Sequence, residues 1–211
     1  MKLFNLDHSP YATRVRIQIQ HGELPIAVEP PPTRLRTPEF TTQFPYGKIP
    51  ILQLDNGSHL ADSWVIMEYL ESCFPHSGLL PADALERARM QTLARCADTC
   101  LGPGGVFPMF AAVAKRENAA TLIENMDAEL RRLDGVLAAQ GDVAARSLHL
   151  GDVALAPHLS YLLLLAPLFG AEDALGGYSA VSAWWQWVNS DAALAGELAV
   201  MQNAAAAFFK N

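Results

Sequence analysis

Polar and apolar positions follow one pattern in the first third of the chain and another in the rest. Short apolar or alternating runs, "KLFNL", "PIAVE" and "IPILQL", predict three strands near the start. A fourth strand follows after "DNG", because Asn-Gly favours the positive φ angles of a tight hairpin turn. The segment "DSWVIMEYLESCF" then predicts a helix that Asp62 or Ser63 can cap.

Beyond a Pro- and Gly-containing segment, "PHSGLLPAD", nearly every pattern is helical. "LERARMQTLARCADTCL" predicts an amphipathic helix that "GPGG" interrupts, and "DVALAPHLSYLLLL" predicts an apolar helix at the centre of a helical domain. One further helix carries an apolar stripe made of Leu122, Met126, Leu130, Leu133 and Leu137. We therefore expect a mixed α/β domain at residues 1–75, a linker at 76–84 and an all-helical domain at 85–211.

The segment "RVRIQIQ" has two interpretations. Its polar and apolar residues alternate, which predicts a strand. Against that, Ser9-Pro10 makes a good helix start, and Ala12, Val15 and Ile19 can share one helical face. The residues by themselves leave both interpretations open.

Composition narrows the class of protein. The 211 residues are 51% apolar and carry a net charge of −7 without a basic block, which indicates a globular chain and argues against nucleic acid as a partner. Three cysteines without a C-x-x-C motif indicate a reduced, cytoplasmic protein with no disulfide framework. Cys96 and Cys100 are expected to be small buried helix residues, and no metal site is expected, because no His or acid completes a ligand set.

No membrane association is expected from the pattern. The start, "MKLFNL", turns polar within a few residues, so no signal peptide is predicted. The most apolar run, "VALAPHLSYLLLLAPLF", is taken as too short to span a bilayer and contains two prolines and a histidine. We expect it to form a buried core helix.

Asp7, His8 and Ser9 are the residue types of a serine-hydrolase triad, but they are consecutive. Neighbouring side chains point in different directions, so the three cannot form the relay from acid to base to nucleophile. The chain also lacks G-x-S-x-G. A serine hydrolase is excluded, and Ser9 needs another partner if it has a chemical role.

Two longer stretches resemble a known family. "FPYGKIPILQLDNGSHLADSWVIMEYLE" combines Pro-x-Gly-Lys-Ile-Pro, a short hairpin, an acidic-Ser pair and a helix ending in Tyr-Leu, and "SPYATRVRI" places Ser-Pro-aromatic after the first strand. "GDVALAPHL" also matches the start of the family's core helix. This chain resembles the glutathione transferase superfamily in its serine version. The resemblance implies a thioredoxin-like N-terminal domain that binds glutathione, an all-α C-terminal domain, and a helix over "YATRVRIQIQHG".

The resemblance also implies a role for Ser9. Its hydroxyl would donate a hydrogen bond to the sulfur of glutathione and, with the helix N-terminus, favour the thiolate. Taken alone, Ser9 could be only a helix cap. Tyr11 is the rival hydroxyl, and it could instead line the acceptor pocket or merely pack there. His8 is left unassigned, as an exposed loop residue.

The remaining glutathione contacts are implied in the same way. A cis bond before Pro50 would present the backbone of Ile49 to the cysteinyl part of glutathione. Lys48, with Arg36 or Arg34, would face the glycyl carboxylate, although a solvated surface charge is the alternative for each arginine.

The acidic-Ser pair would hold the γ-glutamyl end. Ser63 would bind the α-carboxylate at the start of its helix, and Asp62 would take the ammonium. The alternative is a simple helix cap. Many relatives carry Glu or Gln in place of Asp62, so the shorter arm could weaken or shift this contact.

The helical domain offers a wall for the acceptor substrate. Phe107, Met109 and Phe110, in "GVFPMFAAV", could line a pocket or belong to the core. His149 stands where relatives place Ser or Thr in a capping box, so only the one-sided cap from Asp152 is expected, at a cost in stability.

The function expected from this resemblance is a glutathione transferase, with glutathione as cosubstrate and a small electrophilic hydrophobic molecule as acceptor. A glutathione-dependent cis-trans isomerase or dehalogenase would use the same thiolate. A non-catalytic scaffold for protein binding is the alternative from another class, although it would not need the side chains of Ser9, Pro50 and Ser63. A homodimer is expected from the family.

Overall fold

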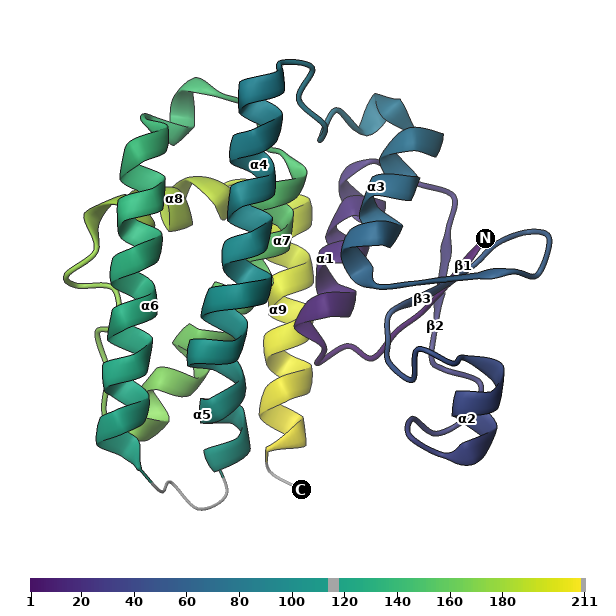
Figure 1. Cartoon of the computed structure of the whole chain (residues 1–211), viewed down its shortest axis with the longest axis horizontal. Coiled ribbons are helices and arrows are strands. Elements are labelled where there is room, and N and C mark those ends of the chain that lie inside the picture. The colour runs from purple at the N-terminus through teal and green to yellow at the C-terminus, as the bar shows by residue number, and fades with distance from the viewer. Residues whose placement is uncertain (114–117, 210–211) are drawn as a thin grey trace.

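The computed structural model describes residues 1–113 and 118–209, which form two domains lying side by side (Figure 1). The first domain is a four-stranded sheet with three helices. Its elements are β1 (Lys2–Phe4), α1 (Pro10–His21), β2 (Ala27–Glu29), α2 (Pro38–Gln43), β3 (Ile51–Gln53), β4 (His59–Ala61) and α3 (Ser63–Cys73). The predicted strands, the hairpin and the helix after it are confirmed. The short helix α2 is not predicted by the sequence pattern.

The sheet has the order β2-β1-β3-β4, with β1 parallel to β2 and antiparallel to β3. Successive side chains of a strand point to opposite faces, and here both faces are apolar. Leu3 and Leu52 join the main core on one face, whereas Phe4 and Ile51 form a separate cluster with Phe40 of α2. The short helix α2 therefore covers the face that the main core leaves open.

The turn between β3 and β4 differs in detail from the expected one. Leu54 N–H donates to the Ser58 carbonyl (2.9 Å), and Gly57 has a φ of +83°. Asn56 has no positive φ, so the expectation holds for Gly57 only. The Asn56 side chain instead accepts from the Ser58 amide (3.0 Å).

The second domain is helical, as predicted, and confirms the fold class. Its longer elements are α4 (Ala84–Cys96), a wider π-type segment (Ala97–Val106), α5 (Phe107–Ala112), α6 (Ala119–Gln140), α7 (Leu150–Leu165), α8 (Ser179–Val188) and α9 (Ala192–Phe208). The predicted stripe of α6 is confirmed, because its five residues are the buried ones of that helix. The limits 1–75, 76–84 and 85–211 stay predictions.

The "GPGG" segment does not interrupt the helical run, so that prediction is wrong. The chain continues from α4 through the π-type segment into α5, with Pro103 inside it (Figure 1). Wider turns occur where the regular hydrogen-bond ladder is disturbed, as a proline without an N–H requires. Gly105 packs so closely on α7 that a Cβ there would lie 2.7 Å from Leu162 Cδ1.

The ambiguous segment "RVRIQIQ" is helical in α1, with Ser9 as N-cap and Pro10 in the first turn. Every residue from 12 to 19 is buried, because α1 packs against α3 in its own domain and against α7 and α9 in the other. Figure 1 shows α1 between the two domains. The alternation of polar and apolar residues is therefore compatible with a helix that is buried on opposite sides. Its buried polar residues form hydrogen bonds with polar side chains of other elements.

The core helix α7 is confirmed, but the length argument for it is wrong. Together with the turn that follows, Leu150–Phe169 is long and apolar enough to cross a membrane. Most of this stretch is buried inside the protein, against α1, α4 and α9 among others. Burial, and not length, identifies it as a core helix.

The start of α7 carries a complete capping box, so the prediction of a one-sided cap is wrong. Asp152 N–H donates to His149 Nδ1 (3.3 Å), and His149 N–H donates to the Asp152 carboxylate (3.1 Å). The imidazole nitrogen of His149 thus accepts the hydrogen bond that a Ser or Thr hydroxyl accepts in the usual capping box. Arg146 donates to both carboxylate oxygens (2.6 and 2.8 Å), and the Trp184 indole adds a bond of 2.8 Å.

Candidate active site

A polar cleft lies at the N-terminus of α3, between the sheet domain and the helical domain. It is lined by Tyr11, Arg14, Tyr46, Lys48, Ile49, Pro50, Asp62, Ser63, Arg95 and Asp98. The first N–H groups of a helix have no partners within the helix and suit an anion. The cleft therefore joins six of the predicted residues around a helix end.

Arg14 organises this cleft, although the sequence analysis assigns it no role. Its Nε donates to Ser63 Oγ (2.8 Å), and Nη2 donates to the same oxygen. Nη1 donates to Asp98 Oδ1 (2.9 Å), across the domain boundary. Because Ser63 Oγ accepts these bonds, its own hydroxyl hydrogen remains available to a ligand in the cleft.

Asp62 caps α3 and faces the cleft at the same time. Its Oδ1 accepts from the amides of Trp64 (2.9 Å) and Val65 (3.3 Å), and its Oδ2 accepts from the Tyr46 hydroxyl (3.3 Å). The backbone of Asp62 has a φ of +70°, a region that favours glycine. The predicted helix cap is therefore present, and the carboxylates of Asp62 and Asp98 both lie beside Ser63 in the cleft.

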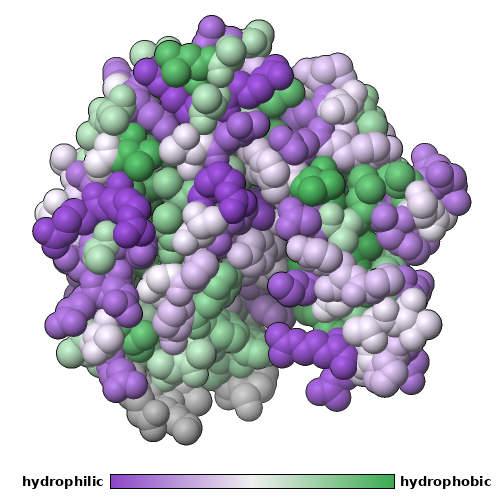
Figure 2. Space-filling model, viewed as in Figure 1, coloured by the Kyte–Doolittle hydropathy of each residue, from purple (hydrophilic) through white to green (hydrophobic). Residues whose placement is uncertain are grey.

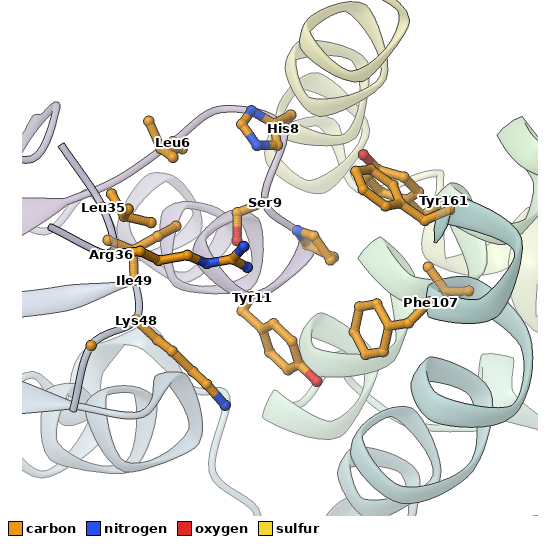
Figure 3. A pocket seen from close by; sticks show the side chains of 14 residues that line it. Leu6, His8, Ser9, Tyr11, Leu35, Arg36, Lys48, Ile49, Phe107 and Tyr161 are labelled. Atoms are coloured by element: carbon orange, nitrogen blue, oxygen red, sulfur yellow. The ribbon is translucent and has the colours of Figure 1, made fainter. Parts of the chain in front are cut away.

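A second cavity, of about 270 Å³, adjoins the polar cleft and also lies between the domains. It is lined by Leu6, His8, Ser9, Pro10, Tyr11, Leu35, Arg36, Gly47, Lys48, Ile49, Val106, Phe107, Phe110 and Tyr161. Tyr11, Lys48 and Ile49 line both spaces. Figure 2 shows the surface hollowed between the two domains, and Figure 3 shows the side chains that converge there.

The loop before β3 separates the two spaces. The predicted cis peptide bond between Ile49 and Pro50 is confirmed. Pro50 lies on the polar side, whereas Ile49 borders both spaces. A ligand that extends from the cleft into the cavity would therefore pass along Ile49.

Ser9 lies at the boundary where α1 begins. Its Oγ accepts from the Ala12 amide (3.2 Å), and its carbonyl accepts from the Thr13 hydroxyl (2.8 Å). Within residues 1–113 and 118–209 no group accepts from the Ser9 hydroxyl. The hydroxyl can therefore donate to a ligand atom in the cavity while the serine caps the helix.

Tyr11 lies between the two spaces, and its ring is held from several sides. It stacks on Phe107 (centroids 5.9 Å apart) and meets the edge of His158 (4.9 Å), with the Arg14 guanidinium 4.9 Å from its centroid. Burial, with Asp98 nearby, raises the pKa of the Tyr11 hydroxyl. The phenol therefore stays protonated near neutral pH.

The predicted cations lie on the sheet-domain side of the cavity. Arg36 and Lys48 line it, whereas Arg34 does not. Both side chains are exposed, and neither forms an ion pair with an acid in the described part of the chain. Lys48 Nζ lies 5.8 Å from the centroid of the Tyr46 ring. Of the two predicted arginines, Arg36 is therefore the one that lines the cavity together with Lys48.

The helical domain supplies an apolar wall. Phe107 and Phe110 line the cavity, but Met109 points into the core, where it is fully buried. The three candidates thus divide between pocket and core, as expected for neighbours on one helix.

The run Asp7, His8 and Ser9 forms no relay. The Asp7 carboxylate accepts from the Asn5 amide (2.7 Å), and the His8 ring stacks on Phe208 of α9 (4.9 Å). His8 is half-buried and lines the cavity, so it is not the exposed loop residue expected. Burial lowers the pKa of His8 and outweighs the opposing effect of Asp7.

The sequence analysis missed Arg14, Asp98 and Tyr161. Arg14 gives one local signal, because a charged residue in a segment buried on both sides needs a partner. No pattern connects it to Asp98, which lies 84 positions away. Cys96 and Cys100 are half-buried instead of buried, and the described residues contain no cluster of His, Cys, Asp or Glu that could hold a metal.

The comparison with protein families decides the assignment. A family model described as the N-terminal domain of glutathione S-transferase matches residues 8–73. A probable glutathione transferase of Aplysia californica is 34% identical over 79 residues, which cover 37% of this chain and 85% of the relative. The chain belongs to the glutathione S-transferase family.

Two further proteins are similar to this glutathione S-transferase family member. Maleylacetoacetate isomerase of Pseudomonas aeruginosa is 35% identical over 99 residues, 44% of this chain and 47% of the relative. The crystal structure of a glutathione transferase family member from Pseudomonas fluorescens, with bound glutathione, is 27% identical with a TM-score of 0.73, covering 93% of this chain and 97% of the other. This chain matches about half the length of the first curated relatives.

Proposed function

We propose that this chain is a glutathione transferase that holds glutathione as a thiolate beside Ser9 and directs the sulfur at an electrophile in the adjoining cavity. The observation that carries the proposal is the position of the Ser9 hydroxyl. It caps α1, lines the cavity and has no acceptor in the described part of the chain. A donor at a helix N-terminus stabilises an anion there.

The physical need for such a donor comes from the thiol. A free thiol has a pKa of about 8.5, so it is mostly protonated and weakly nucleophilic near neutral pH. A hydrogen bond to sulfur and the positive end of a helix dipole both favour the thiolate. Ser9 would supply both effects, and it would activate the nucleophile of another molecule without attacking by itself.

The polar cleft fits the γ-glutamyl end of glutathione. Ser63 and the N-terminus of α3 would bind the α-carboxylate, while Asp62 and Asp98 would attract the ammonium group. Arg14 would hold Ser63 and Asp98 in position. The shorter side chain of Asp62 already caps the helix, so Asp98 would share the ammonium.

The rest of the tripeptide would lie along the loop before β3. Ile49 would pair its backbone with the cysteinyl residue, next to Pro50, as an added strand does. Lys48 and Arg36 would attract the glycyl carboxylate. The acceptor would then occupy the side of the cavity formed by Tyr11, Phe107 and Phe110, whose rings suit an apolar molecule.

Two measurements on Ser9→Ala test the role of the hydroxyl. Calorimetry with glutathione should give nearly the affinity of the wild type, while the pKa of the bound thiol, followed by thiolate absorbance, should rise. Turnover should fall about 100-fold, as for other single donors to a developing or bound anion. Ser72→Ala, at an exposed serine of α3 whose hydroxyl bonds to the Glu68 carbonyl, is the matched control.

Contrary results have distinct meanings. An unchanged thiol pKa in Ser9→Ala would move the activating role to another hydroxyl, with Tyr11 the first to test. If the wild type shows no saturable binding of glutathione, the enzyme proposal fails and a non-catalytic scaffold becomes the better explanation.

A second candidate reaction uses the same site. The relative from Pseudomonas aeruginosa is named an isomerase, and reversible addition of a thiolate to a cis double bond allows rotation before the sulfur leaves. Wild-type protein with glutathione should then convert a maleyl compound to the fumaryl isomer without consuming glutathione. Dehalogenation would instead release halide and consume glutathione.

The assembly proposed with this function is a cytoplasmic homodimer. Homodimers and detoxification are typical of the family, and the three cysteines are free thiols. Light scattering of the purified chain at several concentrations would test the dimer, and a monomer at every concentration would contradict it.

A further inference from the structure

The wall that the helical domain gives to the cavity contains one polar side-chain atom. Four residues form this wall, Val106, Phe107, Phe110 and Tyr161, and the first three have hydrocarbon side chains. The Tyr161 hydroxyl is the exception. Figure 3 shows it reaching from its helix toward the side of the cavity that carries His8 and Ser9.

The hydroxyl of Tyr161 has no hydrogen-bond partner within residues 1–113 and 118–209. The residue is 2% exposed, and its oxygen is buried without a hydrogen bond to any described residue. The ring is held by Phe110 and Phe209, with centroids 5.9 and 6.4 Å away. Packing alone would be satisfied by phenylalanine, because a buried hydroxyl that lacks a partner is unfavourable.

We propose that Tyr161 is a catalytic residue whose hydroxyl donates a hydrogen bond to the carbonyl oxygen of an α,β-unsaturated carbonyl electrophile. This inference rests on the proposed function and names its acceptor class. The thiolate beside Ser9 attacks from the sheet-domain side, and Tyr161 binds the electrophile from the opposite wall. The electrophile lies between the two hydroxyls.

The chemistry requires a donor at this place. When sulfur forms a bond to the β-carbon, the electron pair of the C=C bond shifts toward the carbonyl and the oxygen gains negative charge as an enolate. The hydrogen bond from Tyr161 stabilises that charge more than it stabilises the neutral carbonyl. The α-carbon then takes up a proton from solvent, which replaces the proton that the thiol released on binding, so the product is the neutral thioether.

The surroundings keep Tyr161 in the donor form. Burial raises the pKa of its hydroxyl to about 12, so the phenol remains protonated near neutral pH. The rings of Phe110 and Phe209 beside it are apolar, and an apolar environment strengthens a hydrogen bond to a developing charge. Tyr11 is less suited to this role because it belongs to the polar cleft as well, beside Asp98.

The test compares two electrophiles of similar size in wild type and Tyr161→Phe. 4-Phenyl-3-buten-2-one carries a conjugated carbonyl, whereas benzyl chloride reacts by displacement and develops no charge on oxygen. We expect kcat/KM to fall about 100-fold with the enone, as expected when one oxyanion donor is removed, and less than about twofold with the chloride. An equal fall with both electrophiles, or no fall with the enone, would overturn the proposal.

Stability supplies a second, independent readout. Because its hydroxyl is unpaired, Tyr161→Phe should leave Tm unchanged or raise it. The matched control is Tyr178→Phe, because the Tyr178 hydroxyl donates to the carbonyl (3.2 Å) and the carboxylate of Asp127. Tyr178→Phe should lower Tm and leave the ratio of enone to chloride activity unchanged. A lower Tm in Tyr161→Phe would assign its hydroxyl to structure.

The outcomes separate this inference from the proposed function. A wild type that binds glutathione and conjugates benzyl chloride but not the enone overturns the role of Tyr161 and keeps the transferase. A wild type that neither binds glutathione nor turns over either electrophile overturns both.

Discussion

α1 and α7 are both buried inside the protein, but α1 is held by polar pairs and α7 mainly by apolar packing. α1 carries Arg14, Arg16 and Gln18 among its buried residues, and each has a polar partner in another element. α7 is apolar over most of its surface; most of its side-chain hydrogen bonds meet at Asp152 in its first turn, and Ser160 accepts one from Gln202 of α9 (2.9 Å). The comparison indicates that α1 joins the two domains through the pairs of Arg14 and Arg16, while α7 acts as the hydrophobic centre with its main polar anchor at Asp152.

The largest effect is expected at the anchor of α7. Asp152→Ala removes the acceptor shared by Arg146, the His149 amide and the Trp184 indole. The His149 amide and the Trp184 indole would stay buried without a partner and Arg146 would lose its ion pair, so the free energy of unfolding should fall by about 3–5 kcal/mol. Urea unfolding measures the change. Asp134→Ala, which removes the cap of α8, is the control and should lose about 1 kcal/mol; equal losses would contradict the special role of Asp152.

The next effect separates two arginines of α1. Arg14→Met and Arg16→Met each break an ion pair between a buried arginine and a partly buried acid, Asp98 and Glu197 respectively. Each should lower the free energy of unfolding by about 3 kcal/mol, because a carboxylate that is largely removed from solvent loses its partner. Only Arg14→Met should also weaken glutathione binding, by roughly tenfold, because Ser63 loses a charged donor. Calorimetric titration of both variants with glutathione measures the two affinities. If both variants bind glutathione equally weakly, α1 affects the cleft only by holding the two domains together.

The smallest effect is the pH dependence of the anchor. Burial alone would raise the pKa of Asp152, but the hydrogen bonds from Arg146 and His149 outweigh it and lower the pKa to about 2, from an ordinary 3.8. The folded state therefore favours the carboxylate. Its contribution, about 2 kcal/mol, is complete above pH 4 and is lost as the pH falls toward 2. The difference in urea midpoint between wild type and Asp152→Asn should shrink over that range, and a constant difference would contradict the assignment.

Local patterns predict much of this fold. Three strands, a hairpin, the stripe of α6 and the central position of α7 follow from period and turn chemistry. The continuation of the helical run through "GPGG" does not, because Gly105 packs closely on Leu162 of α7, a tertiary contact that no local pattern shows. The complete capping box also escapes prediction, since histidine is not among the usual hydroxyl or carboxylate caps.

The residues of the candidate site also fall into two groups, those that local motifs predict and those that they do not. Ser9, Ile49, Pro50 and the pair Asp62-Ser63 belong to short motifs that resemble the glutathione transferase family, and that resemblance predicts that they share one site. Arg14 and Asp98 become partners only when two domains meet, and the wall position of Tyr161 depends on which face of α7 points at the cavity. Pairings across domains leave no local period in the sequence, and for that reason the sequence did not reveal them.

The enclosure of α1 has a consequence for the order of folding. The ion pair between Arg16 and Glu197 joins residues 181 positions apart, and α1 packs on α9 and α7 as well as on α3 of its own domain. Contacts of such long sequence separation form slowly because a long loop must close first. During synthesis the sheet domain leaves the ribosome early, but one side of α1 stays uncovered until α9 has emerged. Of these two domains, the one that is made earlier is thus completed only after the other has emerged.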